Sequence, residues 1–189
     1  MAVDLGTGDG SFVLRAAASA PATLWIGLDP VAAAMARSSS EALRRRTGNA
    51  IFVLGAVESL PGELTACASR VTVNLPWGSL LRAVAAPEVT LLANIASICQ
   101  PGACLEIVYS ASARDTAELA RVGLREADPE TRLADLKLDY ADAGFRLDGV
   151  TRIDSAGLRD LGTTWAKRLW RDPERQAWRI LARARPAAG

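Results

Sequence analysis

The stretch "VDLGTGDG", residues 3–10, decides the fold class. An apolar strand-like run leads into Asp4, glycines follow at the alternate positions Gly6, Gly8 and Gly10, and a helix is expected to begin near Ser11. Glycine allows a sharp turn and lets a ligand approach the backbone more closely than a Cβ would permit, while the following helix presents unpaired N–H groups. This strand–turn–helix unit is typical of nucleotide-binding α/β folds.

The glycine spacing indicates which ligand is bound. A dinucleotide fingerprint is G-x-G-x-x-G, but here the third glycine falls one residue early and Ser11 occupies its place. The spacing therefore disfavours NAD. An acidic residue just before a G-x-G-x-G turn is the pattern of S-adenosylmethionine-dependent methyltransferases, and Asp4 would match the positively charged amino-acid end of that donor.

Further β-type runs alternate with Ala-, Leu- and Arg-rich helical stretches, which is the βαβ pattern of a parallel sheet. After 143 the pattern changes to two more strand-like runs, which suit antiparallel pairing at a sheet edge. We therefore expect a class I methyltransferase fold (Rossmann-like α/β) with a mostly parallel seven-stranded sheet. The expected strands are 2–6, 24–29, 50–56, 70–75, 104–110, 145–153 and 178–184, the expected helices are 11–19, 30–46, 80–99 and 128–143, and "QPGAC" at 100–104 is expected to be a turn.

Residues at the ends of three further strands extend the cofactor prediction. Asp29 ends the second strand and could accept both ribose hydroxyl protons. Val57 and Glu58 follow the third strand, where the adenine ring and its amino group would lie. Each site alone could also be a tight turn with a solvated acid. With Asn74 from the fourth strand, the predicted cofactor-binding residues are Asp4, Gly6, Thr7, Gly8, Gly10, Asp29, Pro30, Val57, Glu58 and Asn74.

Length and composition set outer limits on the function. The 189 residues, half of them apolar, suit one domain spanning 1–189. Neither a membrane-spanning run nor a secretory signal is evident, which predicts a cytoplasmic protein without membrane contact. The sequence contains no histidine, which excludes Ser-His-Asp and Cys-His catalysis. Three cysteines without a CxxC pair are expected to be reduced core thiols, so we predict no metal site.

Charge is segregated along the chain although the formal net charge is only +1. Residues 114–148 are acid-rich, whereas 152–185 carry nine basic and four acidic residues. The basic part, above all 154–175, could be a solvated helix face or a polyanion-binding surface.

Two tryptophans are candidates for a substrate site. Trp77 lies directly after the fourth strand in "VNLPWGSLL", at the sheet edge where open α/β folds bind substrates. "NLPW" is similar to the N-P-P-aromatic motif of enzymes that methylate exocyclic amino groups, although Leu75 departs from it. Trp165 is followed by Lys167 and Arg168, which places a stacking surface beside phosphate-binding charges.

Structural explanations exist for the same tryptophans. Trp77 could pack under a neighbouring helix. Trp165 could belong to the apolar stripe of an amphipathic helix with Leu161, Leu169 and Trp170. Trp25 and Trp178 lie within strand-like runs and are expected in the core.

The motifs "VDLGTGDG", "GLDP", "ESLP", "PWGSLL" and "WAKRL", in this order over nearly the whole chain, resemble those of the aminoglycoside-resistance 16S rRNA methyltransferases of the Kam and Npm type. The resemblance implies transfer of a methyl group from S-adenosyl-L-methionine, leaving S-adenosyl-L-homocysteine, to N1 of adenine 1408 in helix 44 of the 30S ribosomal subunit. It implies that Trp77 and Trp165 are the catalytic residues and hold the flipped adenine. It also implies that Thr163 supports the base or donor pocket, and that the rRNA phosphates meet Lys167, Arg168, Arg171 and Arg175.

The same resemblance implies an enzyme that acts as a monomer and confers aminoglycoside resistance. Adenine N1 carries a free lone pair, so methyl transfer needs alignment and no general base. The family normally carries an N-terminal β-hairpin, yet this chain begins three residues before Asp4. We therefore expect either a shortened start or a dispensable hairpin.

Two other functions stay open at this point. One is methylation of another RNA base or of a small molecule, which would keep the glycine turn and Asp29 but give Trp77 a different partner. The other is a non-catalytic RNA-binding module that has lost donor binding.

Overall fold

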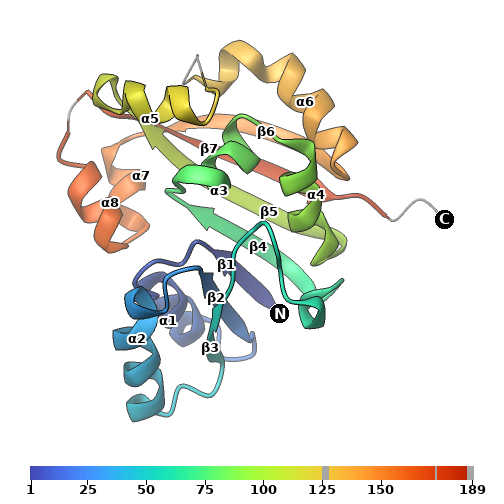
Figure 1. Cartoon of the computed structure of the whole chain (residues 1–189). Coiled ribbons are helices and arrows are strands. Elements are labelled where there is room, and N and C mark those ends of the chain that lie inside the picture. The colour runs from blue at the N-terminus through green and yellow to red at the C-terminus, as the bar shows by residue number, and fades with distance from the viewer. Residues whose placement is uncertain (125–127, 173, 187–189) are drawn as a thin grey trace.

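A single sheet organises the computed structural model, which describes residues 1–124, 128–172 and 174–186. Its seven strands follow the order β3-β2-β1-β4-β5-β7-β6 (Figure 1). Strands β1 to β5 are parallel to one another, whereas β7 runs antiparallel to both β5 and β6. The predicted fold class, with its antiparallel edge pair, is confirmed. The strands are β1 (Ala2–Leu5), β2 (Trp25–Asp29), β3 (Ala50–Leu54), β4 (Ala68–Asn74), β5 (Cys99–Ala111), β6 (Phe145–Ile153) and β7 (Gln176–Ala184).

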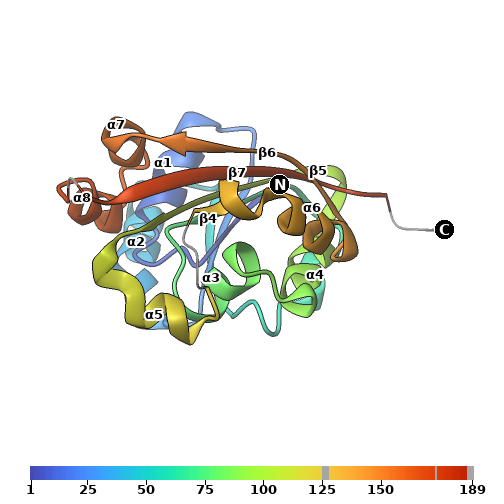
Figure 2. The same ribbon diagram turned by 90° about the horizontal axis from the view of Figure 1, so that it is seen from above.

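Helices cover both faces of the sheet. Seen from above, α3, α4 and α5 lie on one side of β5 and β7, and α7 lies on the other (Figure 2). The helices are α1 (Ser11–Ser19), α2 (Ala32–Arg45), α3 (Gly78–Ala85), α4 (Val89–Ser97), α5 (Thr116–Arg121), α6 (Leu133–Asp142), α7 (Ser155–Asp160) and α8 (Thr164–Leu169), with 3₁₀ turns η1 (Gly62–Leu64), η2 (Ala113–Asp115) and η3 (Pro129–Arg132).

The main core lies between the sheet and the layer of α3, α4 and α6. Here the ring of Trp178 stacks on that of Tyr109, its register partner in β5, with centroids 5.2 Å apart. Trp25 lies in a smaller cluster with Val13 and Ala17 of α1. Both Trp25 and Trp178 are buried, as predicted.

The helix expected over 80–99 is wrong as a single element. The chain forms α3 and α4, bent by 92° at a break that contains Pro87. Proline lacks the N–H that would continue the helix and forces the preceding residue out of the helical region. No single helix among the described residues is long and apolar enough to cross a membrane, although α3 and α4 together meet the requirement by length and composition.

The turn expected at 100–104 lies inside β5 instead. The register between β4 and β5 shifts there, from Ala68 opposite Cys99 to Arg70 opposite Cys104. The extra residues form a bulge in which Gly102 takes a φ of +79°. The turn chemistry of the sequence is thus used within a strand.

The basic segment 154–175 contains two short helices, α7 and α8, between β6 and β7. A separate apolar cluster fixes them against the sheet and the end of β4. Its buried members are Leu75, Val108, Leu158, Ala166, Leu169 and Ala177. The segment therefore has a defined position above the carboxyl end of the parallel strands.

Candidate active site

A cavity of about 480 Å³ opens at the carboxyl ends of β1, β2 and β4. The strand order reverses between β1 and β4, and such switch points are where open α/β sheets bind ligands. The cavity is lined by nearly all of the predicted cofactor-binding and catalytic residues, namely Asp4, Gly6, Thr7, Gly8, Asp29, Pro30, Val57, Glu58, Asn74, Trp77, Thr163 and Trp165.

Asp4 places a carboxylate at the bottom of this cavity. It is 1% exposed and accepts hydrogen bonds from Thr72 Oγ1 (2.7 Å) and Asn74 Nδ2 (3.0 Å) on the adjacent strand. Burial raises the pKa of Asp4 to about 6, even though these hydrogen bonds favour the charged form. A cationic ligand group would offset the cost of keeping this carboxylate ionised.

Asp29 ends β2 and is fixed by the backbone. Its Oδ2 accepts the N–H of Gly8 at 2.8 Å, and its Oδ1 accepts the N–H of Val31 at 2.9 Å. Each carboxylate oxygen keeps lone-pair capacity for another donor. The carboxylate is therefore held rigidly at the cavity wall and can still receive two hydroxyl protons.

Two glycines of the turn, Gly8 and Gly10, are needed for different physical reasons. A Cβ on Gly8 would meet no atom within 4 Å, so the space beside this backbone is open, and Gly8 lines the cavity. Gly10 does not line the cavity. A Cβ there would lie 2.4 Å from Phe52 Cε1 and 2.9 Å from Ser38 Cβ, which shows that Gly10 allows α1 to pack closely. Gly10 therefore has a packing role in this structure, and its expected contact with the cofactor stays a prediction.

The far end of the cavity is formed after β3. Val57 is buried, and its carbonyl accepts a hydrogen bond of 3.0 Å from Asn94 Nδ2 in α4. Glu58 is exposed, and a hydrogen bond from the Ser79 hydroxyl lowers the pKa of its carboxyl. An acceptor and an apolar wall therefore lie side by side, as an adenine ring with an amino group requires.

The segment that follows β4 explains the position of Trp77. Leu75 adopts a φ of +56°, is buried, and donates its N–H to the Val108 carbonyl at 2.7 Å. This left-handed residue turns the chain, and Trp77 then forms the N-cap position of α3 with its side chain 36% exposed. Trp77 therefore lines the cavity and stays partly exposed.

Trp165 lines the same cavity, although it belongs to α8 near the C-terminal end of the chain. Its ring centroid lies 6.2 Å from that of Trp77, with the planes inclined by 44°, and its side chain is 47% exposed. Thr163 caps α8 by accepting the Ala166 N–H at 3.0 Å, which orients the first turn that carries Trp165. The Arg168 guanidinium lies 5.7 Å from the Trp165 centroid, within cation–π range.

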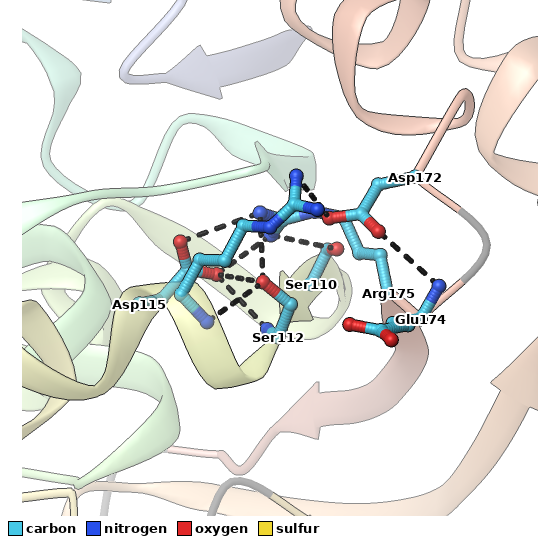
Figure 3. Close-up of polar contacts among 7 residues, drawn as sticks. Ser110, Ser112, Asp115, Asp172, Glu174 and Arg175 are labelled. Atoms are coloured by element: carbon cyan, nitrogen blue, oxygen red, sulfur yellow. Dashed lines mark hydrogen bonds and ion pairs between the residues drawn. The ribbon is translucent and has the colours of Figure 1, made fainter.

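The predicted phosphate-binding residues divide into two groups. Lys167, Arg168 and Arg171 are exposed. Arg175, in contrast, has a side chain only 7% exposed, and its guanidinium donates to Asp115 Oδ2 at 2.8 Å (Figure 3). Bonds to Ser110 and Ser112 complete this buried network. This burial does not fit the expectation that rRNA phosphates meet Arg175, because the ion pair holds its guanidinium inside.

Several residues of the site are missed by sequence reasoning. Thr72 is a polar residue inside the apolar run "RVTVNL", a signal that could have identified it as the partner of Asp4. Asp9 lies between two glycines and lines the cavity together with Thr164. Ser79 and Asn94 carry no local signal, because only the fold brings them to the end of β3.

The sequence matches the family model described as "NpmA: 16S rRNA (adenine(1408)-N(1))-methyltransferase" over residues 1–184. The chain belongs to this family. An Escherichia coli 16S rRNA (adenine(1408)-N(1))-methyltransferase is 32% identical over 94% of this chain and 84% of its own length. The corresponding protein of Streptoalloteichus hindustanus is 30% identical over 95% and 84%.

Solved structures of 16S rRNA (adenine(1408)-N(1))-methyltransferases and related resistance enzymes share the fold. The crystal structure of the aminoglycoside resistance methyltransferase NpmB1 is 38% identical, with a TM-score of 0.79 over 97% of this chain and 86% of that one. A variant of the 16S rRNA (adenine(1408)-N(1))-methyltransferase from Catenulisporales acidiphilia, solved with the cosubstrate SAM, is 30% identical, with a TM-score of 0.87 over 100% and 87%. The family is S-adenosylmethionine-dependent, which agrees with the cavity described above.

Proposed function

We propose that this protein is an S-adenosylmethionine-dependent methyltransferase that modifies N1 of adenine 1408 in 16S rRNA. Its substrate is helix 44 in the assembled 30S subunit, so it acts in the cytoplasm, and it works as a monomer with one methyltransferase domain. The observation that carries the proposal is the pair of half-exposed tryptophans directly beside a cavity lined by Asp4 and Asp29.

The residues present suit S-adenosylmethionine. The open space beside the Gly8 backbone admits the amino-acid part of the donor, and the buried Asp4 carboxylate matches a cationic group. Asp29 can accept hydroxyl protons of a ribose, and Val57 with Glu58 can hold an adenine. When bound, the donor supplies an electrophilic methyl group on a sulfonium.

The tryptophan pair offers two indole faces to a flipped base. Stacking a base between two rings requires them to be about 7 Å apart, because each stacked contact spans about 3.5 Å. The ring centroids are 6.2 Å apart and the planes are inclined by 44°, so the rings must both rotate toward parallel and move apart before a base fits between them. Stacking returns about 1–3 kcal/mol per base and offsets the few kcal/mol lost when the base leaves its helix.

The chain's own residues contribute orientation to the reaction. Adenine N1 attacks through an in-plane lone pair, so no residue has to remove a proton. This agrees with a sequence without histidine. Trp77 and Trp165 would fix the ring plane, while exposed Lys167, Arg168 and Arg171 would bind the flanking phosphates. Holding the reacting atoms in a near-attack geometry can account for most of the acceleration.

Resistance follows from the chemistry of the product. A methyl group on N1 blocks an edge that aminoglycosides contact and leaves a positive charge on the base. Cationic drugs are then repelled at short range.

The proposal is tested by incubating purified 30S subunits with the protein and S-adenosylmethionine, followed by mass spectrometry of helix 44 fragments and primer extension. We expect one added methyl group and a reverse-transcription stop at adenine 1408, because N1 methylation blocks base pairing. Methylation at an exocyclic amine would give no stop and would favour a different base or substrate. Absence of S-adenosylhomocysteine binding in calorimetry would favour a non-catalytic RNA-binding module.

A further inference from the structure

The glycine turn is connected directly to the helix that carries Trp165. The Thr164 hydroxyl donates a hydrogen bond to Asp9 Oδ2, which joins the first residue of α8 to the turn after β1. Asp9 Oδ1 accepts the Ser11 N–H at 3.0 Å, and the Asp9 carbonyl accepts the Ser38 hydroxyl. The Asp9 side chain is therefore fixed on the turn while its second oxygen holds α8.

A second contact joins the same two regions. The Arg15 guanidinium in α1 donates to the carbonyl of Leu161, three residues before Thr164. A Cβ at Gly162 would collide with this guanidinium, and Gly162 has a φ of +60°. Glycine at 162 thus permits the loop before α8 to close on α1. Two independent polar contacts therefore hold the α7–α8 segment, one against the glycine turn and one against α1.

Both partners of the first contact line the cavity. Gly8 and Asp9 of the glycine turn and Thr164 and Trp165 of α8 all belong to its lining. Burial raises the pKa of Asp9, but hydrogen bonds from Thr164 and Ser11 and the charge of Lys167 outweigh it and lower the pKa below its usual range. Asp9 is thus ionised at neutral pH, and a charge-assisted hydrogen bond spans the rim of the donor cavity.

We propose that Asp9 is a positioning residue that couples donor binding to capture of the RNA base, through its hydrogen bond with Thr164. The inference rests on the proposed function, because it assigns the donor to the glycine turn and the base to Trp165. A donor bound at the Gly8 backbone would restrict the motion of the glycine turn. The hydrogen bond between Asp9 and Thr164 would then restrict the motion of α8 and of Trp165. By linkage, bound RNA must then tighten donor binding by the same factor.

Thr164 allows the contact to be removed without altering the glycine turn. Thr164→Val deletes the hydroxyl at nearly constant volume, and Thr164→Ser keeps the hydroxyl and serves as the conservative rescue. Thr131→Val is the matched control, since the Thr131 hydroxyl also donates a hydrogen bond at the start of a helical segment, but to the carbonyl of Asp128. Equal melting temperatures of the variants would show that each one folds.

The first measurement needs no RNA. Hydrogen exchange of the α8 amides is followed with and without S-adenosylhomocysteine. We expect the ligand to slow exchange at least about 5-fold in the wild type, Thr164→Ser and Thr131→Val, and less than about 2-fold in Thr164→Val. Equal protection in Thr164→Val, or no protection in the wild type, would overturn the coupling.

The second measurement compares the affinity for 30S subunits with and without S-adenosylhomocysteine. We expect the ligand to tighten 30S binding at least about 5-fold in the wild type and Thr164→Ser, and to have almost no effect in Thr164→Val. A ratio unchanged by Thr164→Val contradicts the coupling alone. Ligand-dependent protection of α8 without any methylation of 30S subunits would leave the coupling standing and refute the proposed rRNA substrate.

Discussion

The indole rings of Trp77 and Trp165 lie 6.2 Å apart, centroid to centroid, and both line the cavity at the carboxyl end of the sheet, although the two residues are far apart in the sequence. Trp77 follows a left-handed Leu75 after β4, and Trp165 sits in the first turn of α8 between β6 and β7. Both side chains remain partly exposed, which is unusual for a close aromatic pair in a core. An exposed aromatic pair at a cavity rim is suited to accept a third ring.

Replacing either indole should remove methyl transfer and leave donor binding intact. We expect Trp77→Ala and Trp165→Ala each to lower methylation of 30S subunits at least about 100-fold, since stacking and orientation are lost together. Calorimetry with S-adenosylhomocysteine should show affinity within a few-fold of the wild type. Parallel loss of donor affinity would mean that the two rings are structural.

Asp4→Asn should weaken donor binding and stabilise the unliganded protein. With a pKa of about 6 in the fold and 3.8 as its ordinary value, ionised Asp4 costs on the order of 3 kcal/mol above pH 6. This cost disappears as the pH falls through 6 toward 3.8, because the folded state then holds the proton. The melting temperature of Asp4→Asn should thus exceed that of the wild type most clearly at pH 8.

The same carboxyl predicts a pH dependence of ligand affinity. Titrations with S-adenosylhomocysteine from pH 8 to pH 5 should show weaker binding below about pH 6, as Asp4 becomes protonated. In Asp4→Asn the pH dependence in this window should be lost. An identical decline in both proteins would assign it to another group.

Gly8→Ala and Gly10→Ala should distinguish a glycine that leaves room for the ligand from a glycine that allows close packing. Both positions have positive φ, so each substitution carries about 1 kcal/mol of backbone cost. Gly10→Ala also forces Phe52 and Ser38 to move and should lower stability further in urea denaturation. Gly8→Ala should be the milder change in stability but should reduce donor affinity more. The opposite ranking would refute the distinction.

The buried pair of Arg175 and Asp115 should contribute to stability. Arg175→Ala leaves the Asp115 carboxylate, whose side chain is 12% exposed, without its main partner, and we expect a loss of about 3 kcal/mol in the free energy of unfolding. Asp115→Ala should cost a similar amount, and the double variant should cost less than the sum. Strict additivity of the two changes would contradict a direct pair.

Lys167 and Arg168 should bind phosphates of the rRNA. Each substitution by alanine is expected to weaken 30S binding and to reduce the salt slope of the affinity by about 1. Arg168→Ala should have the larger effect, because Arg168 also lies over the Trp165 ring. Lys137→Ala, an exposed lysine in α6, serves as control and should leave the slope unchanged.

The sequence by itself determined the fold class and most of the residues that line the cavity. Each group of these residues stands at the end of a strand that the sequence shows locally. The groups are the glycine turn, Asp29, and Val57 with Glu58. In a parallel sheet all such ends meet at one edge. Strand and turn signals are local in sequence, so the fold class and most of the residues that line the cavity could be predicted without coordinates. The exception, Gly10, depends on the distant Phe52.

Only the tertiary structure decided which long-range partners complete the site. Hydrogen bonds and ion pairs between distant segments leave no periodic signal, so the sequence could not show that Arg175 turns inward to Asp115 or that Thr164 reaches Asp9. Composition left Trp77 and Trp165 open between core and site. Their partial exposure and short mutual distance favour the site, and both depend on how the α7–α8 segment packs over the sheet edge.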